Sequence, residues 1–469
     1  MRTTGIIAEY NPFHNGHLYH MEEARRLSGA DYIIVVMSPD FVQRGAPALL
    51  DKWTRARMAL EAGADLVLEL PVRSAVGSAE FFAHGAVSLL SSLGVVDAIS
   101  FGCETDRIGA LAQFAHFLCQ EEPAPYRIAL QQLLREGKSY AQARCMAYLR
   151  YRNTLSPHDS GRSSVSKDDP LEDNALAGIL REPNNILAVE YLKALRKTGS
   201  SMQPCPVLRA GTGYHDLRLY PDTDQSAAQN PAFPSQAYSC APAKDVCPAK
   251  GLVPSPGFAS AAAIRTALLE GRDVRNQMPP AAYDLLREAF RENRYLTSVD
   301  LDLPLRLKLY ECSGSLSAFL DISDDLANRM EHLLPLYTGF EQFAALLKTK
   351  QIAHTRVRRA LLHILLDLKK EAGSHNTVPD PACTGQDPSV ALPVPRYARV
   401  LGFRRSAQPL LSRIKSDASV PLLTKLPPRS QMSEALREDL KASHLWELLI
   451  SHKTGCPIRM EQQRRIIIV

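Results

Sequence analysis

The stretch that decides the fold lies near the N-terminus and reads Ile6-Ile7-Ala8-Glu9-Tyr10-Asn11-Pro12-Phe13-His14-Asn15-Gly16-His17. A short apolar run passes into a polar turn, and His14-x-Gly16-His17 follows at the expected start of a helix. The unpaired N–H groups and partial positive charge of a helix N-terminus suit phosphate groups. Gly16 has no Cβ, so a nucleotide can lie against the main chain there. The pattern predicts a phosphate-binding turn between a strand and a helix.

The two histidines of this turn are the candidate catalytic residues. His14 and His17 are three residues apart and share one face if the segment is helical. Two imidazoles in this position can donate hydrogen bonds to phosphoryl oxygens as negative charge moves onto a pyrophosphate leaving group. Half of a metal site, or two surface side chains, are the alternatives for such a pair. The preceding strand and Asn11-Pro12-Phe13 favour the catalytic interpretation.

The residues that follow alternate between strand-like and helix-like patterns. Strand patterns cover 5–8, 31–37, 65–70 and 98–101, and helical patterns cover 18–27, 50–62 and 79–93. Such alternation predicts a Rossmann-like α/β fold with a parallel sheet that carries helices on both faces. Ligands of such sheets bind at the carboxyl ends of the strands, near the point where the strand order reverses. The turn after the first strand is therefore expected at the binding edge.

The length of 469 residues predicts more than one folding unit. We expect a catalytic domain that carries the phosphate-binding turn over 1–295 and a mainly helical domain over 296–469, because amphipathic repeats cover 326–334, 340–347 and 357–368. Three segments are rich in Ser, Pro, Asp and Gly and lack a periodic apolar pattern, which is typical of insertions. They cover residues 156–174, 221–254 and 371–395.

The composition excludes several classes of protein. Hydrophobic residues make up 45% of the chain and charged residues 22%, as in an ordinary globular protein, and the apolar runs are too short to span a bilayer. Met1-Arg2-Thr3-Thr4 leads directly into the first strand, so no secretory signal is expected. The nine cysteines form no C-x-x-C pair, which argues against a zinc ribbon or a disulfide framework. We expect a cytoplasmic protein without a metal site of its own.

The first stretch resembles the HIGH motif of the nucleotidyltransferase superfamily. Members carry a second signature, Ile-Ser-Ser-Thr-x-Ile-Arg, whose counterpart here is Ala259-Ser260-Ala261-Ala262-Ala263-Ile264-Arg265. Ser260, Ile264 and Arg265 match, whereas alanines replace the second serine and the threonine. We expect Ser260 to cap the following helix and Arg265 to point at phosphates.

Further motifs narrow the resemblance to the bacterial tRNA(Met) cytidine acetate ligase family. They occur in the order Phe101-Gly102-Cys103-Glu104, Pro183-Asn184-Asn185-Ile186-Leu187, Arg209-x-Gly-x-Gly-Tyr214-His215, Lys348-Thr349-Lys350, Thr355-Arg356-Val357-Arg358-Arg359, Arg399-Val400-Leu401-Gly402-Phe403 and Thr424-Lys425. The resemblance covers most of the chain except the three insertions. The set of motifs is specific, although no single member is.

The resemblance implies both a reaction and a nucleotide site. Such enzymes use ATP to convert acetate to acetyl-adenylate and pyrophosphate, and then transfer the acetyl group to N4 of the wobble cytidine (position 34) of elongator tRNA(Met). Mg²⁺ is expected to arrive with the nucleotide. The implied ATP-binding residues are Ile7, Ala8, Glu9, Tyr10, Asn11, Pro12, Phe13, His14, Asn15, Gly16, His17, Leu18, Tyr19, His20, Gly102, Asn184 and Arg209.

A local excess of basic residues in the C-terminal part is the candidate tRNA-binding region. It comprises Lys348, Lys350, Arg356, Arg358 and Arg359. Such a cluster can bind a phosphate backbone. A solvated helix face is the alternative interpretation of any charge run.

Other functions remain possible on the sequence alone. An adenylyltransferase acting on a small phosphorylated cofactor precursor would leave residues 300–469 without a role. A non-catalytic, nucleotide-sensing RNA-binding protein is favoured by Ala261 and Ala262 and disfavoured by the intact segment 9–17. A class I aminoacyl-tRNA synthetase is disfavoured because no Lys-Met-Ser-Lys-Ser segment occurs.

Overall fold

The computed structural model describes residues 1–154, 177–180, 182–209, 258–350, 352–370 and 392–469. The segments predicted as insertions at 156–174 and 221–254, and most of 371–395, lie outside these residues. None of the helices in the described ranges has the length and apolar character that a membrane span requires.

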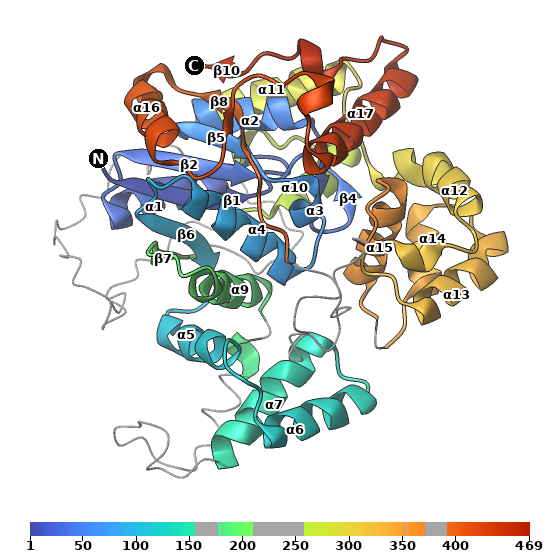
Figure 1. Cartoon of the computed structure of the whole chain (residues 1–469). Coiled ribbons are helices and arrows are strands. Elements are labelled where there is room, and N and C mark those ends of the chain that lie inside the picture. Colours follow the sequence, from blue (N-terminus) through green and yellow to red (C-terminus); the bar gives the residue numbers. More distant parts are fainter. Residues whose placement is uncertain (155–176, 181, 210–257, 351, 371–391) are drawn as a thin grey trace.

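A twisted sheet forms the centre of the molecule (Figure 1). Its strands are β1 (Thr3–Ala8), β2 (Tyr32–Met37), β5 (Leu66–Glu69), β6 (Ala98–Cys103), β7 (Gln203–Leu208), β8 (Ala398–Phe403), β9 (Leu422–Leu423) and β10 (Ile467–Ile468). They lie in the order β10-β8-β5-β2-β1-β6-β7, with β9 beside β8, and β3 (Phe41–Val42) pairs separately with β4 (Ala46–Pro47). The four strands predicted from the sequence are all present, and β1, β2, β5, β6 and β7 are parallel.

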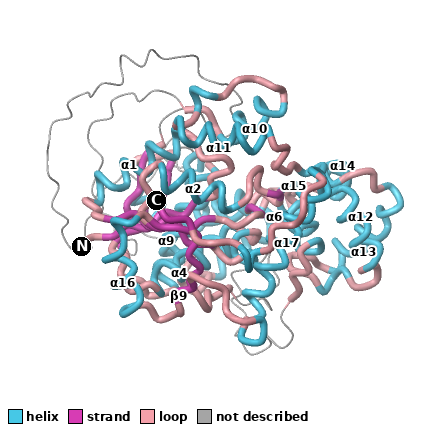
Figure 2. The backbone as a smooth tube through the Cα atoms, turned by 90° about the horizontal axis from the view of Figure 1, so that it is seen from above, coloured by secondary structure: helices cyan, strands magenta, loops and turns pink. Residues whose placement is uncertain are grey.

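Helices cover both faces of this sheet, as predicted for a parallel sheet of apolar strands. Successive residues of a strand point to opposite faces, so Ile7 packs with α4 (Ala79–Ser92), α9 (Pro183–Lys197) and α16 (Gln408–Asp417). Its neighbour Ile6 packs with the helices of the other face. Those are α1 (Asn15–Ser28), α2 (Lys52–Glu61), α10 (Ala261–Leu269) and α11 (Pro280–Arg291). The two layers of helices are visible from above in Figure 2.

The last part of the chain returns to the sheet, which the sequence did not predict. Strand β8 runs antiparallel to β5, and β9 and β10 run parallel to β8, so the sheet is mixed rather than entirely parallel. Because these strands come from residues after 397, a division at residue 295 does not separate the sheet from the helical region. Pairing with β8 satisfies the hydrogen-bonding groups on the outer side of β5, which would otherwise form an open edge.

The predicted amphipathic repeats form a helical region beside the sheet (Figure 1). It contains α12 (Asp302–Glu311), α13 (Asp324–Leu333), α14 (Phe340–Leu347) and α15 (His354–Leu365), and the long α17 (Glu434–Thr454) packs on it. Buried side chains such as Met330, Phe343, Leu361 and Trp446 give this region its own core. The same core includes Phe41 of β3 and Val72 of the short helix α3 (Val72–Ala75), so it adjoins the sheet domain.

Three further helices with both ends in the described residues lie between β6 and α9 in the chain, where strand–helix alternation predicted none. They are α5 (Ile108–Phe117), α6 (Ala124–Arg135) and α7 (Tyr140–Thr154). Helices α6 and α7 pack together as a hairpin that extends away from the sheet, on the side of α5 and α9 (Figure 1).

Candidate active site

The histidine turn lies where the strand order of the sheet reverses. From β1 the chain adds β2 and β5 on one side and then returns to place β6 and β7 on the other side. Residues 9–14 follow the carboxyl end of β1, and Gly102 lies near the carboxyl end of its neighbour β6. This is the crevice in which doubly wound sheets bind their ligands, as the sequence predicted.

His14 and His17 together cap the first helix. His14 is the N-cap of α1, and its Nδ1 accepts a hydrogen bond from the Gly16 amide at 3.1 Å. The Nδ1 of His17 accepts from the His14 amide at 3.3 Å, and the two rings stack with centroids 3.7 Å apart. A neutral imidazole whose Nδ1 accepts carries its proton on Nε2. The cap thus leaves each ring with an Nε2–H group for a ligand.

The environment keeps the histidines of α1 neutral. Burial, with smaller contributions from the charges of Arg209 and Arg265, lowers the pKa of His14 to about 3. Burial and the neighbouring His14 hold the pKa of His17 well below its usual range, and burial and Arg209 lower that of His20 to about 4. Neutral donors fixed in place can stabilise negative charge that develops during a reaction.

These shifts predict an acid-sensitive fold. Above pH 6.5, the ordinary pKa of histidine, folded and unfolded chains both keep His14 neutral, so the free energy of unfolding has its full value. As the pH falls from 6.5 toward about 3, the unfolded chain binds a proton that the folded turn excludes, and the free energy of unfolding decreases. Urea unfolding at about pH 7.5 and about pH 5 should show a smaller loss for His14→Asn than for the wild type. Equal losses in both proteins would contradict the assignment.

Glycine at position 16 serves the histidine cap itself. A Cβ at Gly16 would lie 2.9 Å from Cε1 of His14, which is closer than side-chain carbons approach. The His14 ring therefore takes the place that a side chain at residue 16 would need, and contact between a nucleotide and the main chain of Gly16 stays a prediction.

The other residues assigned to ATP come together from β6, α9 and the end of β7. A Cβ at Gly102 would lie 3.4 Å from Cγ of Arg209, so the arginine side chain passes over the glycine. Arg209 is exposed, and its charge acts on His14, His17 and His20. Asn184, in the first turn of α9, donates from Nδ2 to Oε1 of Glu104 at 2.6 Å. These elements bring one cation and one amide to the edge that carries the histidines.

The second signature contacts the histidine turn through Arg265. Ser260 caps α10, and its Oγ accepts from the Ala263 amide at 3.1 Å, as predicted. Nη1 of Arg265 donates to the carbonyl oxygen of Asn11 at 2.6 Å. Arg265 is thus seated against the turn, close enough to His14 to lower the pKa of that ring.

Arg55 is a buried positioning residue that the sequence reasoning missed. Its Nη1 donates to the carbonyl oxygens of Glu9 at 2.6 Å and Ser38 at 3.0 Å, and Nη2 donates to that of Pro39. The side chain is completely buried, so it ties the carboxyl ends of β1 and β2 together. The signal in the sequence is an arginine among the buried positions of α2.

The basic cluster predicted to bind tRNA is less exposed than the sequence suggested. Lys348 and Lys350 are exposed. Arg358 pairs with Glu341 at 3.1 Å and is 20% exposed, while Arg359 lies 3.8 Å from Asp321 and is 13% exposed. Folding places both guanidinium groups against carboxylates of neighbouring segments, so the five residues do not form one open basic face.

Within the described ranges, no group of three or more His, Cys, Asp or Glu side chains is arranged to hold a metal ion.

Comparisons with known proteins identify the family of this chain. A family model described as HIGH Nucleotidyl Transferase matches residues 1–241 and 249–460. The tRNA(Met) cytidine acetate ligase of Caldanaerobacter subterraneus subsp. tengcongensis is 34% identical over 453 residues, covering 96% of this chain and 95% of that protein. The ligase of the same name from Alkaliphilus metalliredigens is 32% identical over 461 residues, covering 96% and 95%.

Two solved structures have the same overall fold. The crystal structure of Thermotoga maritima TmcAL bound with alpha-thio ATP superposes with a TM-score of 0.76 at 28% identity, covering 100% of this chain and 99% of that one. The apo form of the same protein gives a TM-score of 0.78 at 28% identity, with full coverage of both chains. By the family model and by identity over nearly its whole length, the chain belongs to the tRNA(Met) cytidine acetate ligase family of HIGH nucleotidyl transferases.

Proposed function

We propose that the protein is a tRNA(Met) cytidine acetate ligase that acts in the cytoplasm. It activates acetate with ATP and acetylates N4 of the wobble cytidine of elongator tRNA(Met). The observation that carries the proposal is the capped pair His14 and His17, whose Nε2–H donors lie at the strand-order reversal of the sheet. The relatives at 34% identity bear the name of this activity, which supports the choice of substrates.

In the first step, a carboxylate oxygen of acetate attacks the α-phosphorus of ATP. The bond from this phosphorus to the bridging oxygen breaks, and pyrophosphate leaves with the electron pair. His14 and His17 donate hydrogen bonds to the phosphate oxygens on which negative charge grows. We assign ATP binding to residues 7–20, Gly102, Asn184 and Arg209, and a phosphate contact to the second signature through Ser260 and Arg265. The ATP-analogue complex of the Thermotoga maritima protein supports a nucleotide site in this fold.

Mg²⁺ fits this site as an ion carried by the nucleotide. It usually keeps several water ligands and binds substrate phosphates, so it needs few protein ligands. When bound, it would neutralise phosphate charge, whereas the residues of this chain position the triphosphate.

In the second step, cytidine N4 attacks the carbonyl carbon of acetyl-adenylate. AMP leaves with the electron pair of the broken C–O bond, and N4 loses a proton. The protein has to hold N4 near this carbon and exclude water, which is a task of positioning. The wobble base must leave its stack to reach the sheet edge. We assign contacts with the tRNA backbone to Lys348, Lys350, Arg356, Arg358 and Arg359, of which the exposed lysines are the most accessible.

The decisive experiment incubates the protein with ATP, acetate and elongator tRNA(Met) and analyses the nucleosides by mass spectrometry. We expect N4-acetylcytidine that requires all three substrates, and none from a transcript in which uridine replaces the wobble cytidine. Pyrophosphate release with a phosphomonoester but not with acetate would instead indicate an adenylyltransferase. Tight tRNA binding without any acetate-dependent ATP–pyrophosphate exchange would indicate a non-catalytic RNA-binding protein.

A further inference from the structure

The hairpin of α6 and α7 carries an unusual concentration of positive charge. Residues 124–154 contain six basic side chains, Arg127, Arg135, Lys138, Arg144, Arg150 and Arg152, and one acidic side chain, Glu136. The chain has 55 Lys and Arg residues against 50 Asp and Glu residues, so the remainder of it holds equal numbers of both. The net charge of +5 therefore resides in this hairpin, although Glu121 and Glu122 lie just before it. A local excess of this kind favours a polyanionic partner.

Most of this charge lies on the surface. Arg127, Arg135, Lys138 and Arg150 are exposed. Arg144 is different, because its Nη2 lies 2.7 Å from Oε1 of Glu190 in α9 and it anchors the hairpin to the sheet domain. The exposed groups are thus available to a ligand while the hairpin itself is held in place.

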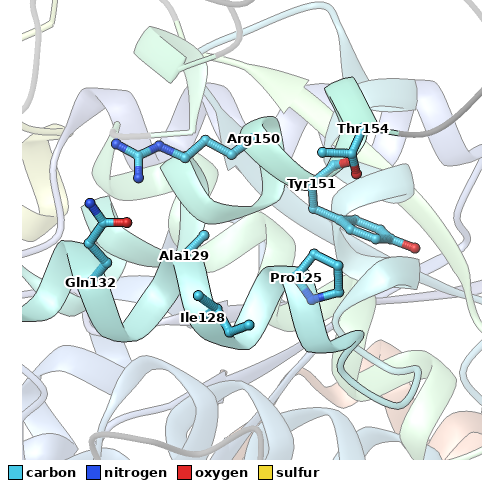
Figure 3. A pocket seen from close by; sticks show the side chains of 7 residues that line it. All are labelled: Pro125, Ile128, Ala129, Gln132, Arg150, Tyr151 and Thr154. Carbon is cyan, nitrogen blue, oxygen red and sulfur yellow. The ribbon is translucent and has the colours of Figure 1, made fainter.

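The two helices also form a groove beside these charges (Figure 3). Its volume is about 410 Å³, and it is lined by Pro125, Ile128, Ala129, Gln132, Arg150, Tyr151 and Thr154. The residues from α6 follow the spacing of one helix face, and Arg135 comes three residues after Gln132 on the same side. Ile128 is 67% exposed in the groove, and Arg150 and Tyr151 lie on the opposite wall.

The lining of the groove has the chemistry that binds an unpaired nucleotide. The Tyr151 ring is half-buried and packs against Phe117 with centroids 5.4 Å apart, which fixes its orientation. Aromatic rings and guanidinium planes stack with bases of single-stranded RNA, and the amide of Gln132 can bond a base edge or a phosphate. An exposed apolar side chain flanked by arginines suits a base with its phosphates better than an acidic peptide.

The groove is connected to the nucleotide site through α9. Glu190, the partner of Arg144, lies six residues after Asn184, or about 9 Å along the helix axis. Asn184 contacts Glu104 beside Gly102. A tRNA whose anticodon loop enters the sheet edge can therefore extend along this side of the molecule.

We propose that the α6–α7 groove, with Arg150 in its lining and the exposed Arg135 and Lys138 farther along the hairpin, is an RNA-binding site. It takes one unpaired nucleotide of the tRNA substrate and the phosphates next to it. This inference rests on the proposed function, because the substrate is the RNA that binds.

The test compares two triple variants that remove the same charge. The groove variant carries Arg135→Gln, Lys138→Gln and Arg150→Gln, and the control carries Arg127→Gln, Arg287→Gln and Lys415→Gln at exposed positions away from the groove. By helical periodicity, Arg127 lies on a different side of α6 from the groove residues. We expect the slope of log K against log salt concentration for tRNA binding to fall by about 2–3 in the groove variant only. Tyr151→Ala should weaken tRNA binding about 5–150-fold, because it removes one stacking contact between a base and an aromatic ring.

Acetate-dependent ATP–pyrophosphate exchange without tRNA should stay unchanged in the groove variant and in Tyr151→Ala, because neither touches the nucleotide site. Equal tRNA binding by the groove and control variants would overturn this inference while leaving the proposed function intact. A wild-type protein that exchanges pyrophosphate but binds no tRNA would overturn both the groove and the assigned substrate. If thermal melting shows that the groove variant is not folded, the single variant Arg150→Gln replaces it. For this variant, the slope of log K against log salt concentration is expected to fall by about 1.

Discussion

Replacing either histidine of the capped turn should lower acetate-dependent ATP–pyrophosphate exchange by on the order of 10²–10³, the usual effect of removing one hydrogen-bond donor from a charge-stabilising site. His14→Asn is the sharper variant, because asparagine also accepts the Gly16 amide as an N-cap and so preserves the start of α1. His14→Ala removes both the cap and the donor, and should cost about 1 kcal/mol of folding free energy in addition. Binding of tRNA should remain close to that of the wild type in each variant.

The matched control is His116→Asn. His116 is exposed on α5, where its Nε2 lies 2.9 Å from Nε2 of Gln120, and it is outside the strand-order reversal. Its replacement should leave pyrophosphate exchange unchanged. Full exchange by a double variant that lacks both His14 and His17 would refute the mechanism, provided that its melting curve shows a folded protein.

The second large effect is expected in a buried ionic cluster that joins the C-terminal segment to the sheet. Lys52 is completely buried, and its Nζ lies 2.6 Å from Oε1 of Glu69 and 3.3 Å from Oε2 of Glu461. Arg399 of β8 contacts the same two carboxylates. Burial alone would raise the pKa of Glu461, but Lys52 and Arg399 hold it at about 2, so this carboxylate stays charged.

Lys52→Met should therefore destabilise the protein by about 3–5 kcal/mol, because it leaves buried negative charge without compensation. Urea unfolding followed by circular dichroism measures this change. Lys441→Met is the matched control, since Lys441 also pairs with a carboxylate, Asp367 at 3.0 Å, but is 62% exposed. Its loss should cost no more than about 1 kcal/mol. Equal costs for the two lysines would show that the cluster contributes little to holding the C-terminal segment.

Local pattern was sufficient for the elements that surround the histidine turn. The apolar runs of β1, β2 and β5 and the amphipathic pattern of the helices between them reflect contacts that each segment makes wherever it packs. Even the pairing of His14 with His17 is local, because residues three apart at a helix start can bond to each other's backbone. The predicted cap at Ser260 was found for the same reason.

Contacts between distant segments could not be predicted in this way. The carboxylate partners of Arg358 and Arg359 lie 17 or more residues away in the chain, so local pattern does not predict these pairs. The basic cluster therefore looked open in the sequence, whereas both arginine side chains are half-buried in the structure. The basic hairpin was missed because its arginines are spread over 26 residues and gather only when α6 and α7 pair.

The sequence by itself determined the strand–turn–helix unit and the position of its two imidazoles at the start of the helix, because both depend on neighbours a few residues away. Only the tertiary structure decided that β8 completes the sheet, that Lys52 meets Glu69 and Glu461, and that Gly102, Asn184 and Arg209 share one edge with the histidines. These arrangements depend on which buried surfaces pack together and which buried charges pair in the folded chain. Periodicity along the sequence does not predict contacts between distant segments.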